Sequence, residues 1–428
     1  MNPEKTISWD YIKRLAIFAV LTLNLGIAFS YAITWFSAGK QGLFWRADFT
    51  MLYTGGTIIR EGQGSRLYDF DLQAETQQRI LDERSFSEGL LPYDYPPHVA
   101  ILITPFTLLP QSKAYLLWTI IQIVLLIWLI RTLLQLMAGW TKLERWLAIS
   151  AVLAFPPLLV NFLLGALSLL MTLSILQFYT QLKNNRKNQA AFWLLLTSLK
   201  PTFLVFPGII LLASRDWKIF WKVVIGGFLI LLGLSAVLGW HIWLDFTNQV
   251  LQISKYYGVH GFHPELMHNL RGTLSLLLGK DRLEVINSIS IIFLALGLLF
   301  CFFIWRGKVK PQDPDFDLRM AITIMLIPLL SLHAYSQDSL VVILAGLIAY
   351  HYFRVNNKRQ KRTFPFLLLY PFLVLISDYV IGDQLSVRLT VIAMIIFTAW
   401  LVVILLDKSN LQNLMMNSNS TSETNGSL

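Results

Sequence analysis

Long apolar runs, separated by shorter polar segments, dominate the chain. A helix needs about 20 apolar residues to cross the hydrocarbon core of a bilayer. The runs predict helices at residues 15–36, 112–137, 146–160, 162–181, 190–199, 201–213, 219–240, 284–305, 318–332, 338–353, 363–379 and 385–407, although several are too short to cross alone. We therefore expect an all-α polytopic membrane protein with about 11–12 transmembrane helices.

Proline interrupts this pattern at two places. Prolines stand near both ends of residues 97–110, so we interpret this run as a half-helix or re-entrant segment. Lys200-Pro201 divides residues 190–213 into two runs, which form either two short crossings or one broken helix. No small-residue cleavage site follows residues 15–36, so this run is predicted to be a retained helix and not a signal peptide.

Composition supports a membrane protein. Hydrophobic residues make up 55% of the 428 residues and charged residues only 14%, with a mean hydropathy of +0.57. A water-soluble core of this length cannot bury so much apolar surface, which excludes a cytosolic enzyme and a disordered chain. Cys301 is the single cysteine, so no intrachain disulfide can form and a cysteine-based metal site is disfavoured.

The net charge of +10 mostly records membrane orientation. With a cytoplasmic N-terminus, the inner segments hold 22 of the 35 Lys and Arg but 9 of the 25 acidic residues. This topology places loops 37–98 and 241–283 outside, and both termini inside, the plasma (inner) membrane. We expect one membrane domain, 1–407, a disordered cytoplasmic tail, 408–428, and no nucleic-acid partner, because no basic–aromatic module occurs.

The first outer loop holds an aspartate close to the predicted membrane surface. Asp48 follows the first apolar run within a dozen residues and has aromatic neighbours, so it is a candidate catalytic group. An ordinary loop aspartate, or an N-cap of a helix over residues 48–60, explains the same position. Residues 72–84 are predicted to form a surface helix, and Pro96-Pro97 to give a rigid entry to the run that follows.

The second outer loop is rich in histidine. It contains Arg271 and four of the seven histidines, which are His241, His260, His263 and His268. Such a group can bind zinc, but the spacing lacks a helical i, i+4 pair and a carboxylate partner. Hydrogen bonding to a phosphate or sugar, or simple placement in interfacial helices, fits the loop better.

Three further polar groups interrupt apolar sequence at the outer ends of predicted spans. They are Asn161 with Ser168, Lys200, and the segment from His333 to Asp338. An ionisable residue at membrane depth is costly and therefore suggests function. The alternatives are a lysine that extends to the membrane surface from a helix end, and a short polar hairpin loop.

Several of these motifs, in this order, resemble glycosyltransferase family 87 of the GT-C superfamily. The motifs are Arg46-Ala47-Asp48-Phe49, the Leu67-Tyr68-Asp69 turn, Tyr95-Pro96-Pro97, Leu199-Lys200-Pro201 and the turn from His333 to Asp338. The resemblance covers about residues 40–340. One turn departs from the family pattern, because Gly165-Ala166-Leu167-Ser168 lacks the expected Gln and Asn.

The resemblance implies a GT-C fold and a polyprenol-phosphate-sugar-dependent glycosyltransferase, with mannose as the expected hexose. It implies an extracytoplasmic active site, a catalytic base at Asp48, and a donor that enters laterally from the bilayer. Polyprenyl phosphate leaves as a stable anion, so one carboxylate and nearby cations suffice, without a metal or cofactor. The residues expected to bind the donor phosphate or sugar are Tyr95, Lys200, His263, His268, Arg271, His333 and Asp338.

Two other functions fit the composition. A transporter or flippase of a lipid-linked sugar would need a polar path through the spans, whereas the charges gather at the ends of the spans. A non-catalytic membrane scaffold would have no pocket that joins Asp48, Lys200 and His333. The acceptor of the expected transferase is an extracytoplasmic lipid-linked molecule or glycan.

Overall fold

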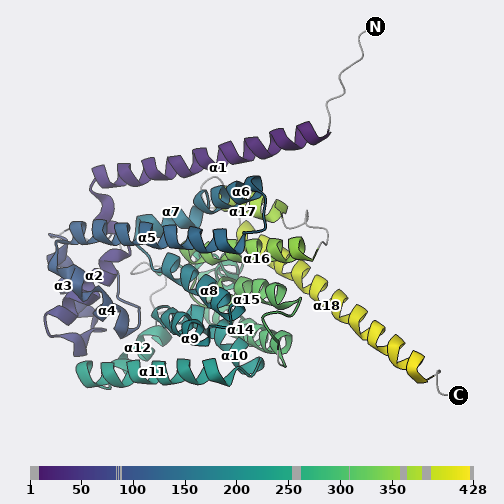
Figure 1. The fold of residues 1–428 in the computed structure, drawn as a ribbon. Coiled ribbons are helices and arrows are strands. Elements are labelled where there is room, and N and C mark those ends of the chain that lie inside the picture. The colour runs from purple at the N-terminus through teal and green to yellow at the C-terminus, as the bar shows by residue number, and fades with distance from the viewer. Residues whose placement is uncertain are drawn as a thin grey trace, which may run out of the picture.

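The computed structural model describes residues 9–82, 84, 86, 89–252, 262–307, 309–356, 364–377 and 387–424, and in these ranges the chain is helical, without a named strand (Figure 1). The α-helices are α1 (Trp9–Lys40), α2 (Phe49–Arg60), α3 (Phe70–Ile80), α4 (Pro97–Ile103), α5 (Gln111–Leu136), α6 (Lys142–Leu153), α7 (Pro156–Leu164), α8 (Ser168–Lys183), α9 (Lys187–Leu196), α10 (Thr202–Ala213), α11 (Trp217–Leu238), α12 (Ile242–Gln252), α13 (Leu270–Leu278), α14 (Leu283–Trp305), α15 (Phe316–Leu330), α16 (Val342–Val355), α17 (Phe364–Leu375) and α18 (Leu389–Thr424). The predicted all-α polytopic membrane fold is confirmed.

Each of the twelve predicted apolar runs corresponds to one or more helices. Among the described residues, six helices are long and apolar enough to cross a membrane, and the bent pair α6–α7, with its 43° angle, makes a possible seventh. The remaining runs form shorter helices, such as α8 and α15, whose side chains are mostly buried. Short inner helices therefore account for the difference from the expected 11–12 spans.

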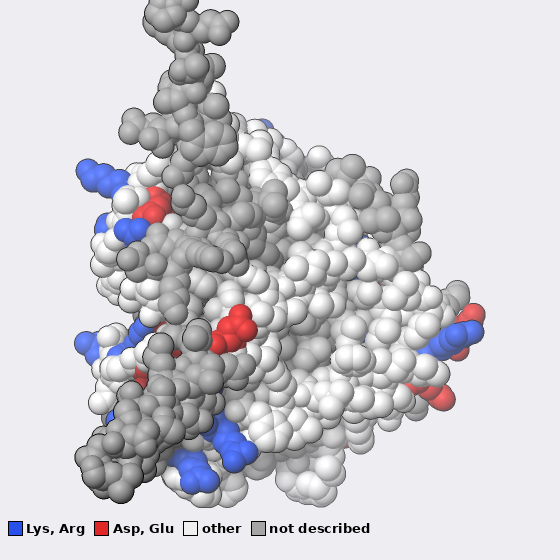
Figure 2. Space-filling view, turned by 90° about the vertical axis from the view of Figure 1, so that its right-hand side faces the viewer, with Lys and Arg blue, Asp and Glu red and all other residues white. Residues whose placement is uncertain are grey.

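The long helices surround this buried centre and present apolar side chains outward. The apolar stretches of α1 and α11 are only 6% and 11% buried, whereas the stretch containing α16 is 83% buried. In Figure 2 a broad white area without Lys, Arg, Asp or Glu separates the charged side chains at the right-hand edge from those on the left. An outward apolar belt between charged edges is the surface that a bilayer requires.

The helices α2, α3 and α4 cluster at the end of α1 where Lys40 lies (Figure 1). The α4 helix continues into a 3-10 helix, Thr104–Leu108, and both pack against α2. This short segment confirms that residues 97–110 do not form a full crossing. The surface helix predicted at 72–84 is α3, which begins two residues earlier because Asp69 accepts hydrogen bonds from two backbone N–H groups of its first turn.

The chain breaks between α9 and α10 at Lys200. A 3-10 turn, Thr197–Leu199, ends α9, and α10 begins after Pro201. The two helices have only 10 and 12 residues, so each is too short to cross a bilayer alone. The break places Lys200 in the interior of the protein, and only 8% of the surface of this residue is exposed.

The last helix, α18, extends to Thr424 and leaves the bundle over its final part (Figure 1). The cytoplasmic location of residues 408–428, their disorder and the single-domain boundary at residue 407 stay predictions.

Candidate active site

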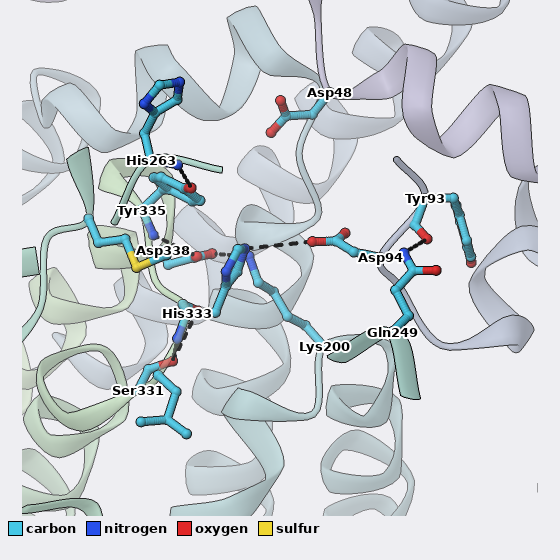
Figure 3. A network of polar contacts seen from close by, with 12 residues as sticks. Asp48, Tyr93, Asp94, Lys200, Gln249, His263, Ser331, His333, Tyr335 and Asp338 are labelled. Atoms are coloured by element: carbon cyan, nitrogen blue, oxygen red, sulfur yellow. Dashed lines mark hydrogen bonds and ion pairs between the residues drawn. The ribbon is translucent and has the colours of Figure 1, made fainter. Parts of the chain in front are cut away.

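A cavity of about 590 Å³ joins segments that lie far apart in the sequence. Its wall comes from the start of α2, the loop before α4, the α9–α10 break, α12 and the loop after α15. Figure 3 shows the polar side chains of this region, which point toward one another from these elements. The residues of the wall that carry a charge or a titratable ring are Asp48, Asp94, Tyr95, Lys200, His333 and Tyr335. Asp48, Lys200 and His333 therefore share one cavity, as the enzyme hypothesis requires.

Asp48 lies directly before α2, held there by the packing of Phe49 against Tyr115 and Trp118, whose ring centroids lie 5.8 and 6.1 Å away. Asp48 is the N-cap residue of α2, as the structural alternative expected, but its side chain accepts no capping hydrogen bond. Its Oδ2 accepts a long hydrogen bond, 3.5 Å, from Nε2 of Gln337. The carboxylate is thus left available to the cavity.

Burial changes the acidity of Asp48. Loss of water around the carboxylate raises its pKa from 3.8 to about 7. Lys200 acts in the opposite direction, and the negative charges of Asp94 and Asp338 raise the pKa further. A carboxyl group that titrates near neutral pH is suited to accept a proton during catalysis.

Lys200 forms a buried ion pair with Asp338, which is itself 1% exposed. Its Nζ lies 2.6 Å from Oδ1 of Asp338. Ser168 Oγ donates to the same oxygen at 2.6 Å, and the backbone N–H of Tyr335 donates to Oδ2 at 3.2 Å. The carboxylate therefore fixes the lysine at the cavity wall and is not itself part of that wall. The alternative of a lysine extending to the membrane surface is wrong, because the ammonium group is enclosed.

The turn that departs from the family pattern supports this ion pair. Gly165 ends α7 with a left-handed backbone (φ +66°), which lets the chain reverse into α8. Ser168 is the first residue of α8, and its hydroxyl faces Asp338. Asn161 accepts a hydrogen bond from the N–H of Leu169 at 3.0 Å, which fixes the turn. The turn therefore positions the counter-ion of Lys200.

His333 faces Asp94 across the cavity. Its Nε2 lies 3.7 Å from Oδ2 of Asp94, and its ring stacks on Phe262 with centroids 6.2 Å apart. Burial and the positive charge of Lys200 lower the pKa of His333 to about 4, so the imidazole is neutral at neutral pH. Burial raises the pKa of Asp94 to about 6. The pair can exchange hydrogen bonds with ligand hydroxyl groups.

The other predicted donor-binding residues lie behind the wall. His263 contacts Glu265 at 3.0 Å, His268 contacts Thr390 at 3.1 Å, and Arg271 donates to the backbone O of Leu332 at 2.8 Å. The side chains of His263, His268 and Arg271 do not line the cavity. Among the described residues, no three His, Cys, Asp or Glu side chains are grouped as metal ligands, and His260 lies outside the described residues.

Sequence reasoning gave no functional role to several polar residues of the wall, among them Asp94, Gln249 and Gln337. Asp94 belongs to the Pro-rich segment, whose only assigned role was a rigid entry to α4. Tyr95, which was expected, lines the wall with its ring centroid 5.9 Å from Nζ of Lys200. A carboxylate between two tyrosines before a rigid Pro-Pro pair was a signal available in the sequence.

The arrangement combines a carboxylate of raised pKa, a fixed cation and a neutral imidazole in one partly enclosed space. It can accept a proton at Asp48 and stabilise negative charge at Lys200. One rim of the cavity consists of apolar side chains of α12 and its neighbours that are also exposed on the outside, among them Val250, Leu251 and Leu266. The site therefore suits a reaction on a substrate that has a charged head and an apolar tail.

Comparison with protein families identifies one match. Residues 93–332 match the model of glycosyltransferase family 87. The matched stretch contains Asp94, Tyr95 and Lys200, while Asp48 precedes it and His333 follows it directly. No curated protein and no solved structure matches the chain. Because the family match covers more than half of its length, the chain belongs to glycosyltransferase family 87, and its activity is the transfer of a sugar from a donor to an acceptor.

Proposed function

We propose that the protein transfers a hexose, with inversion, from a polyprenyl-phosphate sugar to a lipid-linked or glycan acceptor on the extracytoplasmic side of the plasma membrane. Mannose is the proposed sugar, on the basis of the resemblance to the family. One observation carries the proposal: Asp48 and Lys200 lie on one cavity whose rim is apolar and exposed. Family membership supports transfer, and not translocation, as the activity.

The apolar rim supports a lipid donor. Val250, Leu251 and Leu266 line the cavity, yet they are 46%, 74% and 44% exposed. Side chains that reach both the cavity and the outer surface form a lateral opening. A prenyl chain in the bilayer can contact this rim while its head group occupies the cavity, since apolar chains are favoured on such surfaces.

Lys200 supports a phosphate-linked leaving group. It is the one permanent cation among the described residues of the wall. An ammonium group has three N–H donors, and Asp338 Oδ1 accepts from Nζ, which leaves donors for phosphate oxygens. As the sugar–phosphate bond breaks, negative charge grows on the phosphate, and a nearby cation in a water-poor site stabilises it.

Asp48 is the proposed base. An acceptor hydroxyl attacks the anomeric carbon, its proton moves to the Asp48 carboxylate, and the bonding electrons of the broken C–O bond leave with polyprenyl phosphate. One displacement of this kind inverts the anomeric configuration. A stable phosphate anion needs no general acid, in contrast to the paired carboxylates of glycosidases. Asp94 and His333 are then assigned to the hydroxyl groups of the transferred sugar.

The test compares Asp48→Asn with Asp94→Asn and with the exposed, distant control Asp281→Asn, in full-length protein. Each is supplied with polyprenyl-phosphate mannose labelled in the sugar, and a membrane lipid extract provides acceptors. Loss of the base should lower turnover by about 10²–10⁴-fold in Asp48→Asn. Asp94→Asn should mainly raise the KM for the donor, and Asp281→Asn should match the wild type. Wild-type turnover in folded Asp48→Asn would refute the base assignment, and no reaction of the wild type with any polyprenyl-phosphate hexose would refute the donor class.

A further inference from the structure

A second, more polar pocket of about 390 Å³ lies beside the catalytic cavity on the outer loops. The two share Phe70 and Gln249 in their walls, so they are neighbours across one layer of side chains. The mechanism above does not use this second pocket. Its wall consists of Ser65, Arg66, Tyr68, Asp69, Phe70, Asp245, Asn248, Gln249 and Gln252.

The α12 helix separates the two spaces because its two faces differ. Asp245, Asn248, Gln249 and Gln252 follow the three- and four-residue spacing of one helical face, and all four line the second pocket. Phe246 and Val250 lie on another face and line the catalytic cavity. An apolar side and a hydrophilic side thus meet on a helix of 11 residues.

The polar stripe offers hydrogen-bonding groups that the fold does not use. Within the described part of the chain, the side chains of Asp245, Asn248 and Gln252 form no hydrogen bond or ion pair. Gln249 is 8% exposed and donates through Nε2 to the backbone O of Tyr93 at 2.6 Å, as Figure 3 shows. Its buried Oε1 has no partner among the described residues. A buried acceptor without a partner is costly, and a ligand hydroxyl would satisfy it.

The charges of the pocket disfavour an anionic ligand. Arg66 and Asp69 form an ion pair of 2.6 Å, and Oδ1 of Asp69 also accepts hydrogen bonds from two N–H groups at the start of α3. The guanidinium charge is therefore already compensated. Asp245 then leaves the pocket with an excess negative charge, which repels phosphate and carboxylate groups.

The remaining features match a sugar. Amide side chains both donate to and accept from hydroxyl groups, a carboxylate accepts from them, and adjacent groups of these kinds can bind neighbouring hydroxyls. Tyr68 and Phe70 add aromatic rings to the same wall. Such rings provide apolar faces against which the C–H groups of a sugar can pack.

We infer that this pocket binds a neutral sugar residue of the acceptor, next to the residue that is glycosylated. The inference rests on the proposed function, in which the donor enters over the apolar rim of α12. The acceptor then approaches over the polar side of the same helix, and Gln249 lies between them.

The experiment measures glycoside binding to the full-length protein by saturation-transfer difference NMR. Methyl mannoside, methyl glucoside and methyl galactoside serve as sugar probes, and inorganic phosphate serves as the anionic probe. The test variant is Asn248→Ala with Gln252→Ala. The control is Gln135→Ala with Gln189→Ala, which removes two exposed amides from another surface. Asp48→Asn reports whether a probe binds in the catalytic cavity instead.

At least one glycoside should bind the wild type, the control and Asp48→Asn with equal affinity. The test variant should bind it about thirtyfold more weakly, because two hydrogen bonds are removed, a loss that corresponds to about 2 kcal/mol. The inference is overturned if no glycoside binds, if the test variant binds as the wild type does, or if phosphate binds this pocket more tightly than every glycoside. If Asp48→Asn loses transfer and the test variant binds the glycoside as the wild type does, the inferred sugar site is refuted and the catalytic assignment stands. Retained transfer in Asp48→Asn, with binding lost in the test variant, would refute only the catalytic assignment.

Discussion

The pKa of Asp48 predicts how transfer depends on pH. A base must be deprotonated to act, and burial raises the pKa of this carboxyl to about 7. About a tenth of the molecules then have an ionised Asp48 at pH 6, and about nine tenths at pH 8. The value of kcat/KM should therefore rise about tenfold over this interval. An aspartate of ordinary acidity would give an almost flat profile there, because it is fully ionised at both pH values.

Asp94 provides a second check on this assignment. Its negative charge raises the pKa of Asp48, so Asp94→Asn should move the rising limb of the profile to lower pH. The assay is initial-rate transfer from labelled polyprenyl-phosphate sugar between pH 5 and pH 9, with enzyme returned to pH 7.5 to confirm that it has not been inactivated. A flat profile between pH 6 and pH 8, or a limb that moves to higher pH in Asp94→Asn, would refute the reasoning.

Three further predictions concern stability. Asp338→Asn should lower the Tm strongly, since an unpaired buried cation costs about 3–5 kcal/mol. The double variant that also carries Lys200→Met should recover much of the lost Tm without recovering transfer. Equal Tm values for the single and double variants would contradict this prediction. Asp48→Asn should raise the Tm at pH 8 but not at pH 4. A carboxyl whose pKa is raised in the folded state loses its contribution to folding stability as the pH rises from 3.8 through about 7, and the asparagine has no such loss. Thermal scans at both pH values test this, and a higher Tm of the variant at pH 4 would count against it. Gly165→Ala should cost about 1–2 kcal/mol for its left-handed backbone alone, and more because the new Cβ would lie 2.8 Å from Cβ of Phe49; an unchanged Tm would show that the turn relaxes freely.

The helices were predictable because apolar periodicity and proline act locally. The break at Lys200-Pro201 and the short α4 followed from the missing backbone N–H of proline, which favours a helix end at that residue. The number of full crossings did not follow, because a mostly apolar helix of 15 residues such as α15 fits either a short span or a helix buried among others. Only tertiary packing separates these two cases.

The site was predictable where a charge interrupts apolar sequence, and less so within polar loops. Lys200 stood out because its neighbours are apolar, and so did the segment from His333 to Asp338. The pairing of Lys200 with Asp338 did not follow, since 138 residues separate the two. Asp94 was overlooked because a loop aspartate near prolines has an ordinary structural explanation. Whether Asp48 is the base stays a prediction for the experiments above.

The ion pair between Lys200 and Asp338 also constrains how the protein is made. A chain is synthesised from its N-terminus, so α9 and α10 emerge well before the segment that carries Asp338. During that interval, Lys200 lies between apolar helices without the carboxylate that later neutralises it, and such a group is costly within a membrane. Assembly of the first ten helices therefore stays incomplete until the C-terminal helices dock. A chain that ends before residue 338 should be recognised as unfinished and degraded, even though α1, α5, α11 and α14, four of the six candidate spans of the described residues, are already present.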